Sequence, residues 1–170
     1  ASQWKAFLKS LKDRGLNGMR LLISDDQEGL GAARRAVFGS VPWQRCQFHL
    51  QQNAGAYVPK QAMKAEVAAD IRAMFNAPNR RKAEELLQAA IQKYARSAPR
   101  LSAWMEENMA EGFTVFDFPL EYRRMIRTTN SLEQINKEIR RRTRVVGVFP
   151  NEASCLRLVS ALLMETSEEW

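Results

Sequence analysis

The sequence has few of the features that mark secreted, disulfide-linked or membrane-spanning proteins. Two cysteines, Cys46 and Cys155, are too few for a disulfide framework and fit a reducing cytosol. The longest apolar-rich run without a charge, Leu158 to Met164, is far shorter than the ~20 residues of a membrane-spanning helix. No basic segment followed by an apolar stretch opens the chain, so we expect no signal peptide. The first residue is Ala1 and not Met, which is compatible with a piece of a longer protein.

Acidic residues are also in deficit, and the deficit is local. The 170 residues include 26 Lys and Arg against 19 Asp and Glu, a formal charge of +7. Residues 123–144 alone net +6, whereas the rest of the chain nets +1. This concentration favours a polyanionic partner, nucleic acid in the first place, although an arginine-rich solvated helix face would give the same count. The basic residues of the segment are Arg123, Arg124, Arg127, Lys137, Arg140, Arg141, Arg142 and Arg144.

The remaining composition is ordinary for a globular domain, at 45% apolar and 26% charged residues, and its first third alternates helix and strand. Apolar residues at helical spacing predict helices over residues 2–14 and 28–38. A short apolar run predicts a buried strand at 21–23, and residues 43–50, in which polar residues are interleaved among apolar ones, predict a second strand. This order is typical of an α/β fold with parallel strands.

The middle of the chain predicts helices alone. From residue 58 to residue 112 apolar residues recur at helical spacing, with Asn79 as the N-cap of one helix and Pro99 opening another. An all-helical block inside an α/β chain indicates an insertion. We therefore expect three parts, residues 1–57 and 113–170 from an α/β core and residues 58–112 as the insertion.

The last part returns to mixed structure. Residues 113–118 alternate loosely and predict a short extended piece. The basic segment predicts a helix over 130–144, Gly147 predicts a break, and a last helix is predicted over 152–165.

Asp25 and Asp26 directly follow the first predicted strand. Ligands and catalytic groups collect at the carboxyl ends of strands in open α/β sheets, and carboxylates there suit Mg²⁺ or Mn²⁺. Either residue is also a good N-cap for the helix expected near Glu28. Both interpretations stay open from the residues alone.

Glu133 is an acidic residue within the basic segment. On a helix it shares a face with residues suited to phosphate, where a lone carboxylate would repel DNA and a bound divalent ion would reverse that repulsion. The alternative is a capping box, with Asn130 as N-cap and Glu133 three residues later. The residues on its face are Asn130, Asn136, Lys137 and Arg140, and those expected to pack on the core from the opposite side are Leu132, Ile135 and Ile139.

Cys46-x-x-His49 contains the one histidine of the chain. A structural zinc site needs four ligands, and Cys155 is the one other thiol, so the sequence favours a buried cysteine on a strand with a hydrogen-bonded histidine near its end. A catalytic Cys–His pair lacks an evident third group to orient it.

Four stretches together resemble the Mutator-type (MULE-like) transposases of bacterial insertion sequences. The resemblance covers essentially the whole chain and implies the C-terminal portion of a DDE catalytic domain with the ribonuclease H-like fold, partial here, with the helical block in the place of the family's insertion domain. The stretches are Leu21 to Leu30 (LLISDDQEGL), Trp43 to Asn53 (WQRCQFHLQQN), Arg127 to Arg144 (RTTNSLEQINKEIRRRTR) and Val145 to Leu158 (VVGVFPNEASCLRL).

The same resemblance implies roles for particular residues. Asp25 stands where the family has its second catalytic aspartate, and Glu133 where it has the glutamate of its TNxxExxN pattern. Cys46 and His49 match the C/D-x-x-H signature between those acids. With a first aspartate, Asp25 and Glu133 would hold two Mg²⁺ or Mn²⁺ ions for DNA strand cleavage and transfer.

Two departures limit what the resemblance implies. Gln27 stands where the family usually has a histidine. No segment before Leu21 predicts the strand that carries the first catalytic aspartate, so we expect this chain alone to cleave no DNA.

The leading hypothesis is a fragment of a metal-dependent transposase of the bacterial cytoplasm, associated with the nucleoid. Its expected partners are double-stranded DNA, as terminal inverted repeats and target, and further copies of itself in the full-length protein, with no membrane. A truncated remnant that binds DNA without cutting it is the alternative. A helical protein-interaction module would leave residues 123–144 as surface only. The residues expected at the DNA are Arg127, Asn130, Asn136, Lys137, Arg140, Arg141, Arg142 and Arg144.

Overall fold

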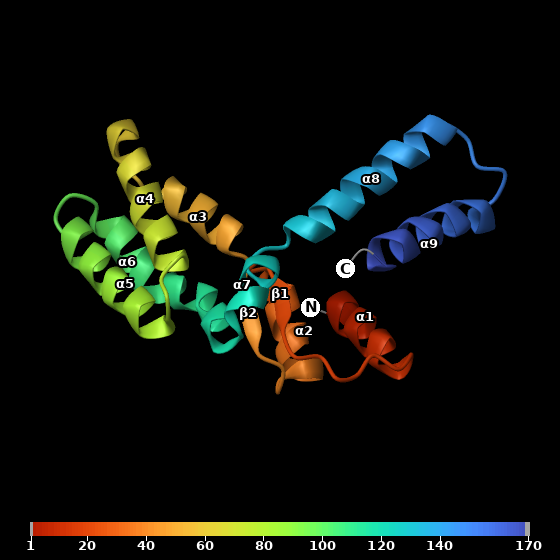
Figure 1. The fold of residues 1–170 in the computed structure, drawn as a ribbon, viewed down its shortest axis with the longest axis horizontal. Coiled ribbons are helices and arrows are strands. Elements are labelled where there is room, and N and C mark those ends of the chain that lie inside the picture. The colour runs from red at the N-terminus through yellow and green to blue at the C-terminus, as the bar shows by residue number, and fades with distance from the viewer. Residues whose placement is uncertain (1, 169–170) are drawn as a thin grey trace. The chain divides into compact units, whose positions relative to one another are not determined.

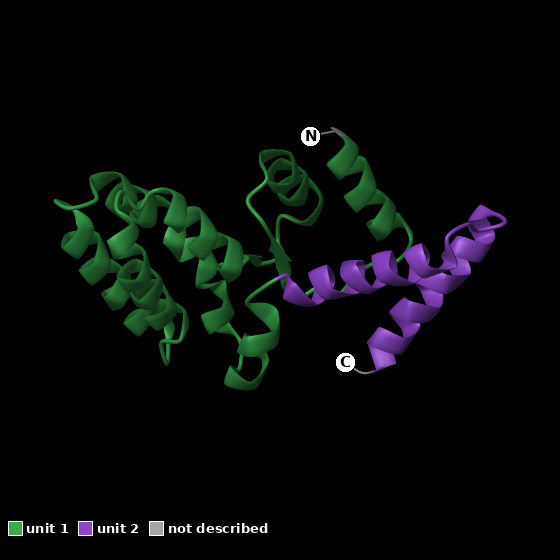
Figure 2. Cartoon of the chain, turned by 90° about the horizontal axis from the view of Figure 1, so that it is seen from above, with its two compact units in different colours: residues 1–128 green, residues 129–170 purple. Residues whose placement is uncertain are grey.

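The computed structural model describes residues 2–168, which fall into two compact units that divide between Thr128 and Thr129 (Figure 2). The first unit runs up to Thr128, and the second begins at Thr129. Neither unit has, among its described residues, a helix that is both long and apolar enough to cross a membrane. The division of the chain into a core and an insertion at residues 57 and 112 stays a prediction.

The first unit opens with the predicted order of helix, strand, helix and strand (Figure 1). The two strands pair in parallel, as predicted, with Leu22 opposite Trp43. The first two helices pack on each other through a small cluster around Leu8 and Phe38. The elements are α1 (Ser2–Asp13), β1 (Leu22–Ser24), α2 (Glu28–Phe38) and β2 (Trp43–Arg45).

The strand predicted over residues 43–50 is too long. It ends at Arg45, and the helix α3 (Gln47–Ala56) follows it. A run this short, with polar and apolar residues mixed, fits both the periodicity of a helix and that of a strand, so the sequence pattern is ambiguous. Burial within α3 recurs at the three- and four-residue spacing of a helix, at Gln47, Leu50 and Ala54.

Residues 58–112, all of which the structure describes, contain helical elements and no strand, as predicted. Asn79 caps its helix by accepting a hydrogen bond from Lys82 N over 2.9 Å, and Pro99 occupies a first turn. The larger hydrophobic core of the unit lies here, with Leu101 and Met105 fully buried. The elements are η1 (Gln61–Met63), α4 (Lys64–Phe75), α5 (Arg80–Tyr94), α6 (Pro99–Asn108) and η2 (Met109–Gly112).

The extended piece predicted at residues 113–118 is wrong, because a short 3₁₀ helix occupies this segment. Val115 and Phe116 are adjacent and both buried, whereas a strand with one solvent-facing side would bury every second residue. The side chain of Gln44 on β2 accepts a hydrogen bond from Val115 N over 2.7 Å and so holds the turn against the sheet. The last elements of the unit are η3 (Thr114–Asp117) and α7 (Leu120–Ile126).

The second unit contains, in its described residues, the helices α8 (Asn130–Val146) and α9 (Glu152–Glu168), which pack on each other (Figure 2). Gly147 ends α8 at the predicted break with a φ of +72°, a conformation that favours glycine. The basic helix therefore extends two residues further than the predicted 130–144.

The core-facing side predicted for α8 is wrong for Leu132, which is 58% exposed. Ile135 and Ile139 are half-buried, and none of the seventeen residues of α8, all of which are described, is fully buried. A single helical hairpin has too little surface to cover every apolar residue that it carries.

Candidate functional site

Asp25 directly follows β1 and Cys46 directly follows β2, so both lie at the carboxyl ends of the parallel strands. Cys46 N donates to Ser24 O over 2.9 Å, which continues the ladder one step past the strands. The Ser24 hydroxyl accepts a hydrogen bond from Trp43 Nε1 and donates one to Asp25 O, each over 2.9 Å. These bonds fix the direction in which the chain leaves β1 at Asp25.

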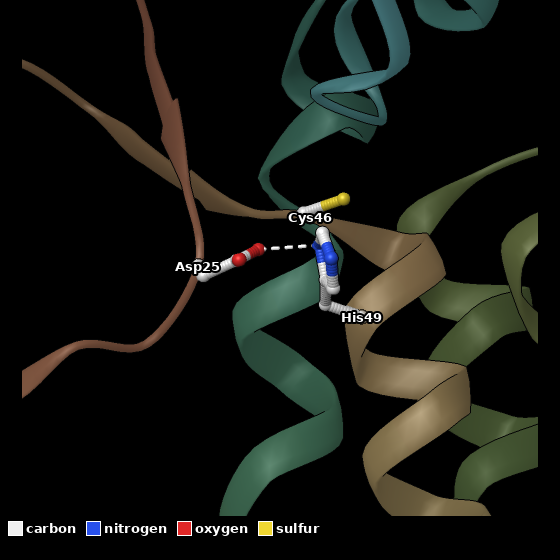
Figure 3. A group of neighbouring side chains, drawn as sticks. All are labelled: Asp25, Cys46 and His49. Carbon is white, nitrogen blue, oxygen red and sulfur yellow. Dashed lines mark ion pairs between the residues drawn. The ribbon is translucent and has the colours of Figure 1, made fainter. Parts of the chain in front are cut away.

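His49 joins Asp25 and Cys46 in one group of side chains (Figure 3). It lies in the first turn of α3, and not on a strand edge as predicted, because the helix begins at Gln47. His49 Nδ1 lies 2.5 Å from Asp25 Oδ1, an ion pair when the imidazole is protonated. A carboxylate oxygen, the thiol sulfur and a ring nitrogen of the three residues all lie within 4.8 Å of one another.

The group is larger than the Cys46–His49 pair that the sequence spacing indicates, because Asp25 supplies a third side chain. It stands 21 positions before Cys46 in the chain and reaches it through the pairing of β1 with β2. Cys46 is buried, at 1% exposure, whereas the Asp25 side chain is 51% exposed. The available signal was that Asp25 follows the first predicted strand and Cys46 lies on the second, which was expected to run parallel to it.

Asp26 has a different partner from Asp25. Its Oδ2 lies 3.3 Å from Nη1 of Arg45, whose side chain is 4% exposed. The same nitrogen lies 2.8 Å from Glu111 Oε2 and 3.0 Å from Asn108 Oδ1, so Arg45 links the sheet to the helical block. Arg45 was not among the predicted site residues, although a charged residue inside a predicted strand was a usable signal.

The capping interpretation of Asp25 and Asp26 is wrong. The N-cap of α2 is Gln27, whose backbone is extended and whose carbonyl accepts a hydrogen bond from Gly31 N over 2.8 Å. The two aspartates lie before that position, and their carboxylates pair with other elements of the first unit.

Glu133 lies in the first turn of α8. The N-cap is Thr129, whose carbonyl accepts from Glu133 N over 3.1 Å and whose hydroxyl donates to Glu133 Oε1 over 3.4 Å. The alternative of a capping box that begins at Asn130 is therefore wrong, because the N-cap is one residue earlier, at Thr129. Glu133 lines a hollow along the helix together with polar and basic residues, among them Asn136, Lys137, Arg140 and Arg144.

Two of the basic residues of α8 are paired within the helix. Glu138 accepts two hydrogen bonds from Arg141, at 2.7 and 2.8 Å, and one from Arg142 at 2.7 Å. These bonds lower the pKa of Glu138 to about 2 and raise the pKa of Arg141. Sequence reasoning counted both arginines toward a phosphate surface, although their spacing of three and four residues from Glu138 predicts the pairing.

Arg123 and Arg127, which precede the second unit in the chain, form hydrogen bonds within the first unit. Arg123 donates to three backbone carbonyls, those of Phe118, Pro78 and Phe116. Arg127 donates from Nη1 to Asn76 Oδ1 over 3.0 Å. The basic segment is thus divided between a part that stabilises the first unit and a part that lies on α8.

The predicted site residues accordingly form two groups. The structure brings Asp25, Cys46 and His49 together in the first unit, and it places Glu133 with the basic face of α8 in the second. The convergence of Asp25 and Glu133 on one metal site stays a prediction.

Comparison with known proteins gives a consistent result. The family model described as "Transposase, Mutator family" matches residues 1–170. The chain is 59% identical over 167 residues to a transposase for insertion sequence element IS406 of Burkholderia multivorans, covering 98% of this chain and 43% of that protein. It is 41% identical to a transposase for ISRM5 of Rhizobium meliloti, covering 99% of this chain and 42% of that protein.

A more distant relative is a transposase for IS256 in transposon Tn4001 of Staphylococcus aureus, at 34% identity over 98% of this chain and 43% of that protein. The chain thus spans about two fifths of the length of these three curated relatives.

Proposed function

The chain belongs to the Mutator family of transposases, and on this premise we propose that residues 1–170 form part of the catalytic domain of a DNA transposase. The reaction is metal-dependent cleavage and transfer of DNA strands at the terminal inverted repeats of an insertion sequence. The full-length protein acts as a homo-oligomer in the bacterial cytoplasm, on the DNA of the nucleoid.

Asp25 and Glu133 are the carboxylates that would hold Mg²⁺ or Mn²⁺. The observation that carries this assignment is the place of Asp25, half-exposed at the carboxyl end of a parallel strand whose exit is held by Ser24. Its carboxylate oxygens are donors of the kind that these hard ions prefer, as is the exposed carboxylate of Glu133. The ions would stabilise the attacking and leaving oxygens of an in-line displacement at phosphorus.

The fold proposed for the domain is ribonuclease H-like, with residues 58–112 as an insertion. The parallel β1–α2–β2 segment supports this, since it is the repeating unit of such α/β folds. The buried Arg45 and Gln44 support it as well, because they bind the sheet to η2 and η3 and so attach the helical block firmly to the strands.

The second unit supplies the DNA surface. Lys137, Arg140 and Arg144 lie on the same side of α8 as Glu133, so phosphates held by these cations would lie beside the metal ligand. Because contacts of this kind go to the backbone of DNA, they give affinity that depends on salt and little preference for sequence.

The test uses a full-length transposase for IS406 in which residues 1–170 replace the matching segment. Excision of a marked element is measured in cells. Asp25→Asn or Glu133→Gln should lower excision by about a thousandfold or more, because metal coordination contributes several kcal/mol to the transition state.

The matched controls are Asp26→Asn, the adjacent carboxylate, and Glu152→Gln at the start of α9, and both should stay within about tenfold of the parent. If Asp25→Asn or Glu133→Gln excises as well as its control, the catalytic assignment is wrong. The remaining hypothesis is then that the segment binds DNA without taking part in the chemistry.

A further inference from the structure

Asp25, Cys46 and His49 offer three kinds of ligand atom at one place (Figure 3). A thiolate and an imidazole are ligands of borderline and soft cations, whereas Mg²⁺ prefers oxygen alone. The catalytic assignment proposed above uses Asp25 and leaves Cys46 and His49 without a part in the chemistry. The donor set of the whole group is that of a zinc site.

The distances fit such an ion after a small adjustment. Zinc lies about 2.3 Å from sulfur and about 2.0–2.2 Å from nitrogen or oxygen, so its ligand atoms are roughly 3.5 Å apart in a tetrahedron. The three ligand atoms here lie within 4.8 Å of one another, and Asp25 Oδ1 and His49 Nδ1 already touch. To hold an ion between them, Asp25 Oδ1 and His49 Nδ1 would move apart by about 1 Å to reach the tetrahedral spacing of ligand atoms.

The backbone holds two of the three ligands in place. Cys46 is the N-cap residue of α3, and Leu50 N donates to its carbonyl over 3.0 Å. His49 lies three residues later on the same side of the first turn. Since Cys46 N is also bonded to Ser24 O, the helix start and the exit of β1 form one rigid frame.

We infer that Asp25, Cys46 and His49 bind a thiophilic divalent cation, Zn²⁺ in the first place, and that this ion competes with Mg²⁺ or Mn²⁺ for Asp25. Three protein ligands among the described residues leave a fourth position for water, as in catalytic zinc sites. The binding site is inferred from the geometry of the first unit alone. The competition of zinc with Mg²⁺ or Mn²⁺ for Asp25 also depends on the proposed function. Zinc would then inhibit strand cleavage by occupying a carboxylate that the catalytic ions need.

The binding test is a titration of the reduced 170-residue chain with Co²⁺, which takes the place of Zn²⁺ and reports its ligands by absorption. We expect one equivalent to bind with thiolate-to-cobalt charge-transfer absorption in the near ultraviolet, and Zn²⁺ to abolish the signal. Cys46→Ser should remove this absorption, and the matched variant Cys155→Ser at the other free cysteine should keep it.

A second variant is needed because Cys46 is buried, so that Cys46→Ser could lose the absorption by misfolding. Asp25 is half-exposed, and its substitution disturbs the fold less. Asp25→Asn should keep the charge-transfer absorption and weaken Co²⁺ binding by about tenfold or more, since even the loss of an outer-shell partner costs about 10–100-fold. Absence of the absorption in the parent chain, its loss in Cys155→Ser, or unchanged affinity in Asp25→Asn would each overturn the site.

The competition is measured separately, with the grafted transposase and its DNA. Micromolar Zn²⁺ should lower cleavage in Mg²⁺, and Cys46→Ser should reduce that inhibition relative to Cys155→Ser. If zinc inhibits both variants equally, the competition is wrong. A graft that cuts no DNA contradicts the proposed function and leaves the cobalt result standing, so the two failures are distinguishable.

Discussion

The two units of this chain differ in what holds them together. The first unit has two clusters of buried apolar side chains, and residues such as Leu101 and Met105 have no exposed surface. In the second unit, Leu162 of α9 is the one buried residue within the two described helices. Tertiary packing therefore stabilises the first unit, whereas α8 is stabilised largely by contacts along its own surface, such as the pairing of Glu138 with Arg142.

The same difference separates the two candidate sites. The group of Asp25, Cys46 and His49 exists because strands and a helix meet, and it would be lost if the first unit unfolded. The face of α8 around Glu133 and Lys137 exists in any helix of this sequence, since it follows from helical spacing. A site built by packing suits a ligand that needs fixed geometry, and a site built along one helix suits a long charged surface.

The largest expected effect is a loss of folding stability when a buried side chain is removed from the core of the first unit. Leu101→Ala removes a fully buried side chain and should lower the free energy of unfolding by about 3 kcal/mol. The matched change Leu156→Ala in α9, at a side chain that is 56% exposed, should cost less than about 1 kcal/mol. Denaturant unfolding followed by circular dichroism measures both, and equal losses would contradict the contrast between the units.

A smaller effect is expected from two glycines of the first unit, with opposite signs. A Cβ at Gly112 would lie 2.7 Å from Leu50 Cδ1 and 3.1 Å from Phe75 Cε1, so Gly112→Ala should destabilise by about 1–3 kcal/mol. A Cβ at Gly55, in α3, would meet no atom within 4 Å. Gly55→Ala should therefore be neutral or stabilise by up to about 1 kcal/mol. Thermal unfolding of the two variants checks the signs, and the prediction fails if Gly112→Ala is the more stable.

The smallest effect concerns the charge of α8 in DNA binding. Arg140→Gln removes one cation from the helix face, so the slope of log affinity against log salt should become shallower by about 0.9. Glu138→Gln releases Arg141 and Arg142 from their pairing and should raise affinity several-fold, with a steeper slope. At pH 7 the carboxylate of Glu138 is fully charged, because its pKa is lowered to about 2.

These slopes are measured by fluorescence anisotropy of a labelled duplex at several salt concentrations. Arg81→Gln and Glu84→Gln, on the exposed side of α5, change the net charge by the same amounts and should leave the slope as it is. If the α5 variants change the slope as much as the α8 variants do, net charge and not the helix face controls binding. A binding constant that does not depend on salt at all would contradict a phosphate surface.

The elements with a strong local pattern were predictable, and those that depend on distant contacts were not. The helices α1, α2, α4, α5 and α6 and the basic helix followed from apolar spacing and from caps such as Asn79. The segment after Arg45 was misread because Gln47 is buried through a bond to Gly112 O, 65 residues later. Residues 113–118 failed for the same reason, since Gln44 holds their backbone from β2.

The site was predictable residue by residue and not as an arrangement. Asp25 and the Cys46–His49 spacing were both visible in the sequence, but the ion pair that joins them was not. The capping alternative for Asp26 is wrong, because Gln27 is the N-cap of α2 and Arg45 of the neighbouring strand pairs with Asp26. In α8 the pairing of Glu138 could have been read from spacing alone, because both partners lie within one turn.

The sequence by itself determined the helix–strand–helix–strand order that opens the chain, the helical character of residues 58–112, the location of the excess positive charge and the family to which the chain belongs. Those properties depend on neighbouring residues, whose spacing along a helix or strand is set by backbone geometry. The tertiary structure decided that Asp25, Cys46 and His49 share one site, that Asp26 is bound to Arg45, and that Leu132 lies exposed. Contacts between residues far apart in the chain depend on which elements pack together, and no local pattern specifies that.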